Sequence, residues 1–147
     1  MSLEEIAEFS NTYFFLSNFY PSEIEFEGKI YPTVEHAFQA AKTTDKSLRE
    51  EIANSTTPGR AKRLGKKLLP RNDWSEVKIP IMKTLLLKKF CDVALRDQLI
   101  RTGSAELIEG NLWNDTFWGC VKEGSGWKGE NHLGCLLMEI RSGLITK

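Results

Sequence analysis

The spacing of apolar residues changes along the chain from strand-like to helical. The segment "YFFLSNFYPS" (13–22) is rich in aromatic residues and ends in a Pro-Ser pair, which predicts a strand followed by a loop. The segment "EIEFEGKIY" alternates around Gly28, with Ile24, Phe26 and Ile30 on one face. This alternation predicts a β-hairpin.

Helical spacing begins at Thr33, which can cap a helix that runs to about Lys42. Asp45 or Ser47 can begin a second helix, and Pro58 fits the first turn of a third. These signals predict that three helices follow the hairpin.

The longest helix is predicted between residues 71 and 103. Pro80 would lie in its first turn, and Gly103 would follow its last. Four residues would form its apolar face: Met82, Leu86, Phe90 and Val93.

The last third of the chain predicts a short strand in "AELIEGN", a loop rich in glycine and tryptophan over residues 112–131, and a terminal helix in "HLGCLLMEIRSGL". The chain has no repeats and no linker, so we expect one domain over residues 1–147. The elements together predict an α+β fold, a single and mostly helical domain with a small β-sheet or hairpin.

The charge composition narrows the classes of ligand. Lys and Arg together number 20, as do Asp and Glu, so the net charge is zero. This balance excludes a bulk attraction to duplex nucleic acid, although a nucleotide ligand needs only a local site. No apolar run is long enough to span a membrane, and the acidic N-terminus lacks the order of a secretory signal. We therefore expect a cytoplasmic protein with no membrane association and no obligate protein partner.

The cysteine and histidine content argues against a metal. Cys91, Cys120 and Cys135 are odd in number and show no CxxC spacing, and the chain has two histidines and no glycine-rich phosphate loop. We expect no metal and no cofactor. The apolar neighbours of the cysteines predict buried free thiols in a reducing compartment.

Candidate chemistry lies in "YPTVEHAFQAAK" (31–42). Glu35, Gln39 and Lys42 stand at i, i+4 and i+7, so they share one face of the predicted helix. Glu35 lies in the first turn, where the helix dipole favours an ionised carboxylate. Spacing alone leaves two interpretations open, a solvated face or a catalytic one, and it favours a structural role for His36. The opposite face would enter the core with Val34, Ala37, Phe38 and Ala41.

Seven segments in order resemble the NADAR family. They are "LSNFYPS" (16–22), "YPTVEHAFQAAK" (31–42), "RNDW" (71–74), "LLLKKF" (85–90), "TGSAELIEGN" (102–111), "NDTFWG" (114–119) and "GENHLGCLLMEIR" (129–141). The resemblance covers about residues 9–143. It implies an N-glycosidase that acts on the bond between ribose C1 and an exocyclic amine.

The resemblance implies two substrates: phosphorylated ribosylamino-pyrimidines of early riboflavin synthesis, and guanine that carries ADP-ribose, either free or within nucleic acid. The alternative is a non-catalytic module that binds ADP-ribose or another nucleotide. A second alternative is an interaction protein whose tryptophans face a partner.

The resemblance also implies the site residues. The catalytic residues would be Glu35, Lys42 and Asp115. The substrate-binding residues would be Asn18, Trp74, Trp118, Gly119 and Asn131, and Gly134 occupies a further motif position. The segment "NLWND" departs from the family by adding Trp113, which puts the substrate preference in question.

Two chemical routes fit these residues. An oxocarbenium route would use Glu35 and Asp115 as the pair of carboxylates. An imine route would use Lys42 as the nucleophile, with Glu35 moving protons. The helix face serves either route.

A basic run, "RAKRLGKK" (60–67), allows two interpretations. Such a run is most often a solvated helix face. The functional interpretation is a patch that contacts phosphate through Arg60, Lys62, Arg63, Lys66 and Lys67.

Overall fold

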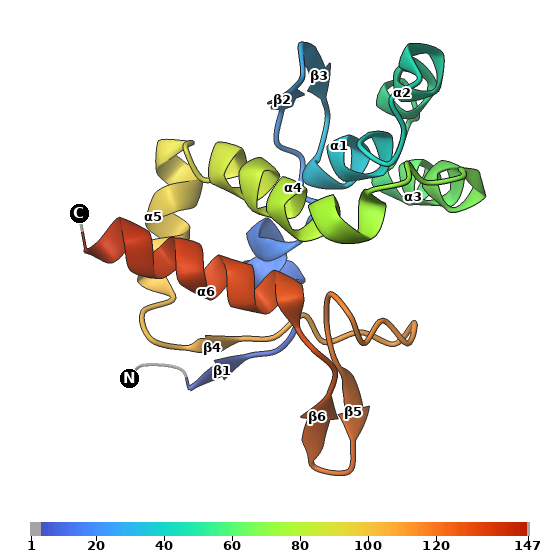
Figure 1. The fold of residues 1–147 in the computed structure, drawn as a ribbon. Coiled ribbons are helices and arrows are strands. Elements are labelled where there is room, and N and C mark those ends of the chain that lie inside the picture. Colours follow the sequence, from blue (N-terminus) through green and yellow to red (C-terminus); the bar gives the residue numbers. More distant parts are fainter. Residues whose placement is uncertain (1–3, 147) are drawn as a thin grey trace. The chain divides into compact units, whose positions relative to one another are not determined.

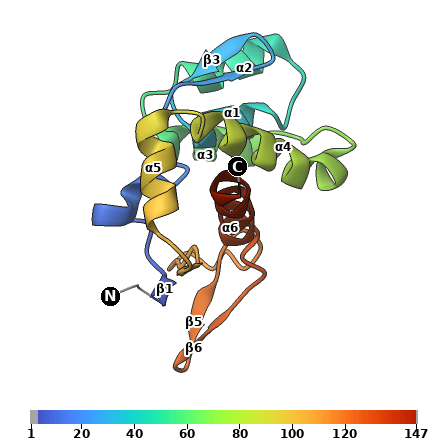
Figure 2. The ribbon, with the colours of Figure 1, turned by 90° about the vertical axis from the view of Figure 1, so that its left-hand side faces the viewer.

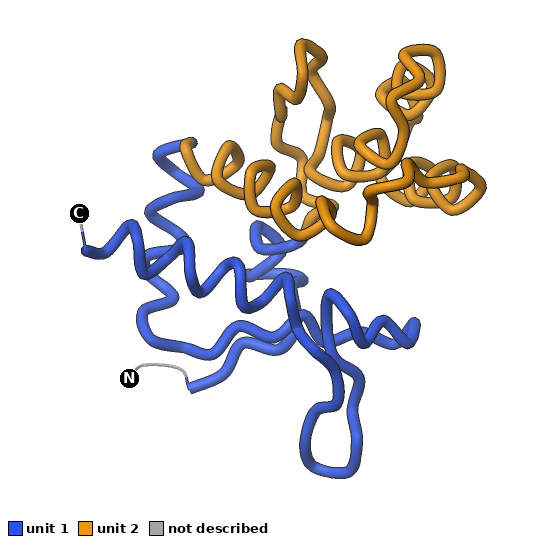
Figure 3. Tube along the Cα trace, in the orientation of Figure 1, with its two compact units in different colours: residues 1–17, 92–147 blue, residues 18–91 orange. Residues whose placement is uncertain are grey.

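The computed structural model describes residues 4–146. They form two compact units, coloured separately in Figure 3. The central unit comprises residues 18–91, and the terminal unit comprises residues 1–17 and 92–147. The division into two units does not test the prediction of a single domain, which stays a prediction.

The central unit begins with the predicted hairpin. Strands β2 (Ile24–Phe26) and β3 (Lys29–Tyr31) pair in antiparallel register, and Glu27 and Gly28 form the turn with positive φ angles of 48° and 85°. This two-residue turn sets Tyr31 opposite Ile24, so both are buried. The prediction for Ile30 is wrong, because the same register places it opposite Glu25 and leaves it 63% exposed.

Four helices complete the central unit: α1 (Val34–Ala40), α2 (Lys46–Ala53), α3 (Pro58–Lys67) and α4 (Trp74–Lys89). The first three begin as predicted, because Thr33, Asp45 and Thr57 each accept a hydrogen bond from the N–H three residues later. Helix α1 contacts the other three helices and both strands (Figure 1). All seven of its residues are buried, so α1 is the core helix of this unit.

The predicted long helix is wrong, because the segment contains two helices. Helix α4 ends at Lys89, and α5 (Val93–Arg101) begins after Asp92, whose carboxylate accepts the N–H of Leu95. This cap breaks the apolar stripe, and Val93 is exposed instead of buried. Pro80 lies inside α4 and not in its first turn.

In the terminal unit, β1 (Glu5–Ile6) pairs in parallel with β4 (Glu106–Leu107), and α6 (His132–Ile145) packs on β4 and α5. Strands β5 (Val121–Glu123) and β6 (Gly126–Lys128) form a second hairpin, which extends away from α6 in Figure 1 and Figure 2. The short strand, the terminal helix and the α+β fold class are confirmed.

Two predictions in the terminal unit are wrong. Residues Asn11–Leu16 form 3₁₀ turns, η1, with a break at Tyr13, and not a strand. Neighbouring Phe15 and Leu16 are both buried there, unlike the alternating residues of a half-buried strand. The predicted loop over residues 112–131 contains the β5–β6 hairpin, with Gly124 at a positive φ of 61° in its turn.

The cysteines differ from the prediction in their burial. All three are free, but only Cys120 is buried, while Cys91 and Cys135 are exposed. Cys135 stands on the outward side of α6, and Cys91 follows the end of α4. Within residues 4–146, no three His, Cys, Asp or Glu side chains gather as metal ligands, and no helix could cross a membrane.

Candidate active site

The two units divide the predicted site residues into two groups. The central unit holds Asn18, Glu35, Lys42 and Trp74. The terminal unit holds Asp115, Trp118, Gly119 and Asn131. Each group is built by its own unit.

Hydrogen bonds between Thr33 and His36 hold the first turn of α1. The Thr33 hydroxyl oxygen accepts the backbone N–H of His36 at 3.1 Å and lies 2.8 Å from its Nδ1 atom. Nε2 lies 3.1 Å from the carbonyl oxygen of Ser55, which only accepts, so Nε2 carries the proton. Burial lowers the pKa of His36, which keeps the ring neutral. The histidine therefore has the structural role expected of it.

The polar face of α1 is not solvated. Glu35 is 8% exposed and Gln39 is 5% exposed, and the Gln39 amide donates to the Glu35 carboxylate at 2.5 Å. A buried carboxylate is costly unless it has partners. Because every residue of α1 is buried, the face that carries Glu35 and Gln39 is not a solvent-exposed helix face.

Lys42 lies half-buried in the turn that follows α1. Burial lowers the pKa of its ammonium group, and Glu35 opposes that effect. Three further ammonium groups lower the pKa again: Lys66, Lys62 and Lys78. The structure thus places a buried carboxylate in the first turn of the core helix and an amine with a lowered pKa just beyond its last turn.

Trp74 is held beside α1 by the chain that leads into α4. The N–H of Arg71 donates to the carbonyl oxygen of Lys42 at 2.7 Å, and the Arg71 guanidinium binds the Asp73 carboxylate through two nitrogens. The Trp74 ring then packs on Phe38 with 5.1 Å between centroids. This half-buried indole, at the start of α4, thus contacts α1, the helix that carries Glu35.

Asn18 is joined to the same helix. Its carbonyl oxygen accepts the N–H of Glu35 at 3.1 Å, and its Nδ2 lies 3.6 Å from the sulfur of Met82. The side-chain oxygen of Asn18 is buried and accepts no hydrogen bond from the described residues. A bound hydroxyl group would satisfy that acceptor.

In the terminal unit, Asp115 organises its own loop. One carboxylate oxygen accepts the N–H groups of Phe117 and Trp118 at 3.0 and 2.9 Å. Buried Asn111 donates to the Asp115 carbonyl oxygen at 2.9 Å and accepts its N–H at 3.0 Å. The loop is therefore firmly shaped, and Asp115 keeps its second carboxylate oxygen for other contacts.

Gly119, Asn131 and Gly134 serve close packing. A Cβ atom at Gly119 would lie 2.1 Å from the carbonyl oxygen of Glu109, and one at Gly134 would lie 2.1 Å from that of Leu107. The Asn131 backbone is in the left-handed conformation, and its side chain accepts the N–H of Glu109 and donates to the carbonyl oxygen of Leu107. Both polar groups of this amide are occupied by backbone, so ligand binding by Asn131 and Gly119 stays a prediction.

Trp118 lies in an aromatic group next to this loop. Its ring is 5.0 Å from that of Phe117 and 6.2 Å from that of His132, both in edge-on geometry. The indole is half-buried, so part of it can contact a ligand.

Sequence reasoning missed three residues. Lys78 stands four residues after Trp74, so helical spacing could have found it. Lys89 follows Met82, Leu85 and Leu86 on the buried face of α4 by the same spacing. Asn111, which shapes the Asp115 loop, could not be found from spacing, because its only sequence feature is its place at the end of the segment "TGSAELIEGN".

Lys89 is the most deeply buried of the cationic side chains. It is 1% exposed, and its ammonium lies 5.6 and 5.3 Å from the ring centres of Tyr20 and Phe90. Burial lowers its pKa from the ordinary 10.5 to about 7. Between these values the unfolded chain binds a proton that the folded chain does not, so this residue makes stability rise with pH.

We expect Lys89→Met to remove that pH dependence. From about pH 7 to about pH 9.5, the free energy of unfolding of the natural protein should rise by about 3 kcal/mol relative to the variant, at roughly 1.4 kcal/mol per unit. Urea unfolding at both pH values measures the difference. Lys67→Met, at an exposed lysine, is the control and should follow the natural protein. Equal pH dependence in Lys89→Met would contradict the lowered pKa.

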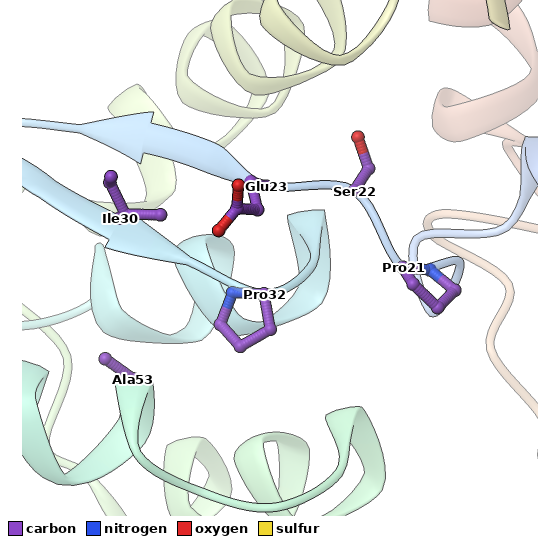
Figure 4. A pocket seen from close by; sticks show the side chains of 6 residues that line it. All are labelled: Pro21, Ser22, Glu23, Ile30, Pro32 and Ala53. Carbon is purple, nitrogen blue, oxygen red and sulfur yellow. The ribbon is translucent and has the colours of Figure 1, made fainter.

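A pocket of about 370 Å³ lies elsewhere in the central unit (Figure 4). It is lined by Pro21, Ser22, Glu23, Ile30, Pro32 and Ala53. None of the predicted site residues lines it, and its one charged group is a carboxylate. A phosphorylated ligand would be repelled there, so this pocket is not the candidate site.

Comparisons with known proteins identify relatives. N-glycosidase YbiA of Escherichia coli is 42% identical over 138 residues, which cover 92% of this chain and 84% of that protein. A riboflavin biosynthesis protein of Vibrio vulnificus is 35% identical over 88% of this chain, which spans 35% of that longer protein. The NMR structure of E. coli YbiA matches with a TM-score of 0.81 and 39% identity, covering 99% of this chain and 88% of that one.

The NADAR domain description matches residues 5–145, almost the entire chain. Its curated relatives named N-glycosidase are hydrolases of N-glycosyl bonds, which agrees with the expectation of an enzyme. The expected resemblance is confirmed, and the chain belongs to the NADAR family.

Proposed function

We propose that this protein is an N-glycosidase that hydrolyses the bond between ribose C1 and an exocyclic amine. Its substrates are phosphorylated ribosylamino-pyrimidines or guanine that carries ADP-ribose. The observation that carries the proposal is Lys42, an amine with a lowered pKa, at the end of the helix that carries the buried Glu35.

The lowered pKa favours the imine route over the oxocarbenium route. A lysine attacks only as the neutral amine, and both burial and neighbouring cations raise that fraction at neutral pH. The oxocarbenium route asks Asp115 to act beside C1 with Glu35. One Asp115 oxygen already accepts two N–H groups of its own loop.

The ribose ring of the glycosylamine opens to an imine at C1 as the exocyclic N–H proton passes to the ring oxygen, and neutral Lys42 adds to that carbon. Glu35 then carries the two protons of the Lys42 amine, one after the other, to the exocyclic nitrogen, which leaves as the free amine of the base. Water then adds to the remaining Lys42 imine, releasing the sugar phosphate and restoring the lysine. The net reaction consumes one water molecule and needs no cofactor.

The names of the relatives support the choice of substrates. The Vibrio vulnificus relative is named for riboflavin biosynthesis, which agrees with a ribosylamino-pyrimidine. Trp74, packed on Phe38, offers an aromatic surface on which a base can stack, worth roughly 1–3 kcal/mol per contact.

The function is tested by incubating the protein with both substrates side by side. Mass spectrometry should detect free base and sugar phosphate from at least one of them. Binding of ADP-ribose, seen as quenched tryptophan fluorescence, without any product would instead identify the non-catalytic binding module.

Trp113 is expected to tune the choice between the two substrates. It is 59% exposed on the loop that Asn111 and Asp115 hold, so its loss should cost little stability. Trp113→Ala should change the ratio of the two turnover rates more than it changes the melting temperature. An unchanged ratio with a large fall in melting temperature would contradict this role.

A further inference from the structure

We propose that Lys62, Lys66 and Lys78 form a subsite for the phosphate group of the ligand. This inference rests on the proposed function, because it names the part of the site that would hold the phosphorylated end of the substrate.

The position of Lys62 and Lys66 follows from the contact between α3 and α1. Ala61 and Gly65 are buried on the side of α3 that faces α1, and a Cβ atom at Gly65 would lie 1.9 Å from the side-chain oxygen of Gln39. Lys62 and Lys66 stand on one flank of that contact, four residues apart. Both ammonium groups are close enough to Lys42, which follows α1, to lower its pKa.

The other basic residues of α3 lie elsewhere. Arg63 and Lys67 fall on the side of α3 opposite Ala61 and Gly65, and Arg60 lies on the flank opposite Lys62 and Lys66. Lys66 is exposed, as these three are, whereas Lys62 is half-buried. The sequence could not separate these two sets, because it does not say which face of the helix meets α1. The solvated interpretation thus holds for Arg60, Arg63 and Lys67.

Lys78 reaches the same place from α4. It lies one turn after Trp74, whose ring packs on Phe38 of α1. Lys78 is half-buried, and its charge acts on Lys42 together with those of Lys62 and Lys66. Helices α3 and α4 therefore bring these three lysines near Lys42, at the C-terminal end of α1.

The balance of charge points to an anion. Of the charged groups that act on Lys42, one is a carboxylate and three are ammonium groups. Like charges held near one another repel, and a bound phosphate relieves the repulsion between them. Lysine binds phosphate as a point charge and needs no bidentate geometry. A phosphomonoester and a pyrophosphate share this chemistry.

The direct test uses inorganic phosphate and inorganic pyrophosphate as separate probes. Titration calorimetry should detect binding of at least one of them to the natural protein, and the tighter probe indicates a monoester or a pyrophosphate ligand. Lys78→Gln and Lys66→Gln should each weaken that binding by about tenfold or more, the usual cost of a lost charged contact. Lys67→Gln, with the same change of charge on the opposite side of α3, should bind like the natural protein.

A second readout separates this proposal from the function itself. With a phosphorylated substrate, Lys78→Gln should raise KM by about tenfold, while a substrate without phosphate should keep its KM. Absence of probe binding to the natural protein, or equal weakening by Lys67→Gln, would overturn the subsite. Probe binding that depends on Lys78 in a protein that turns over neither substrate would leave the subsite standing and overturn the N-glycosidase function.

Discussion

Replacing Glu35 by Gln should lower turnover by at least about a hundredfold, the lower end for a group that moves protons in the transition state. The shape of the side chain is kept, and its oxygen can still accept the hydrogen bond from Gln39. The fold should therefore survive, while the negative charge beside Lys42 is lost.

A matched control is available in α4. Glu76 is, like Glu35, an acidic residue in the first turn of a helix, but it is exposed. Glu76→Gln should keep turnover within about twofold, as expected for a surface change away from the site. The steady-state rate and the circular dichroism spectrum are measured for both variants. A folded Glu35→Gln protein with near-normal turnover would remove Glu35 from the mechanism.

Lys42→Arg should abolish both turnover and chemical trapping. Borohydride added during turnover reduces an imine, so the natural protein should gain the mass of the reduced sugar phosphate on the peptide that contains residues 31–42. Arginine keeps the charge but forms no such adduct, so the variant should lose the added mass and most of its activity.

The outcomes of this experiment separate the two routes. If the natural protein shows no trapping and the Lys42→Arg variant is active, Glu35 and Asp115 would remain as the catalytic pair. Trapping on the peptide of residues 60–67 would move the reactive amine to α3. Lys89 has a pKa of about 7 and could react as a neutral amine, but at 1% exposure it cannot touch a ligand in this structure.

Local signals were sufficient to predict where the first three helices of the central unit begin. Thr33 and Asp45 act as caps through hydrogen bonds that span three residues, so their effect is readable from the chain alone. The same holds for Gly103, which follows α5 in the left-handed conformation with a φ of 64°. Each of these features depends only on near neighbours.

The features that could not be predicted depend on contacts between distant segments. The burial of Glu35 follows from the packing of α1 against three other helices and a hairpin, and no spacing rule reports it. Of the predicted site, the grouping of Glu35 with Lys42 followed from helical periodicity. The packing roles of Asn131 and Gly119 did not, because they depend on the carbonyl oxygens of Leu107 and Glu109.

The division of the chain has a consequence for the order of folding. The central unit is one continuous segment, residues 18–91, whereas β1 of the terminal unit must wait for β4, because Glu5 pairs with Glu106. During synthesis, residues 18–91 leave the ribosome before that pairing partner exists. Contacts that are local in sequence form faster than those that close a long loop. Helix α1, with Glu35 in its first turn and Lys42 after its last, can therefore assemble while the first strand is still unpaired. That strand is an exposed edge, which invites association with other chains until β4 arrives.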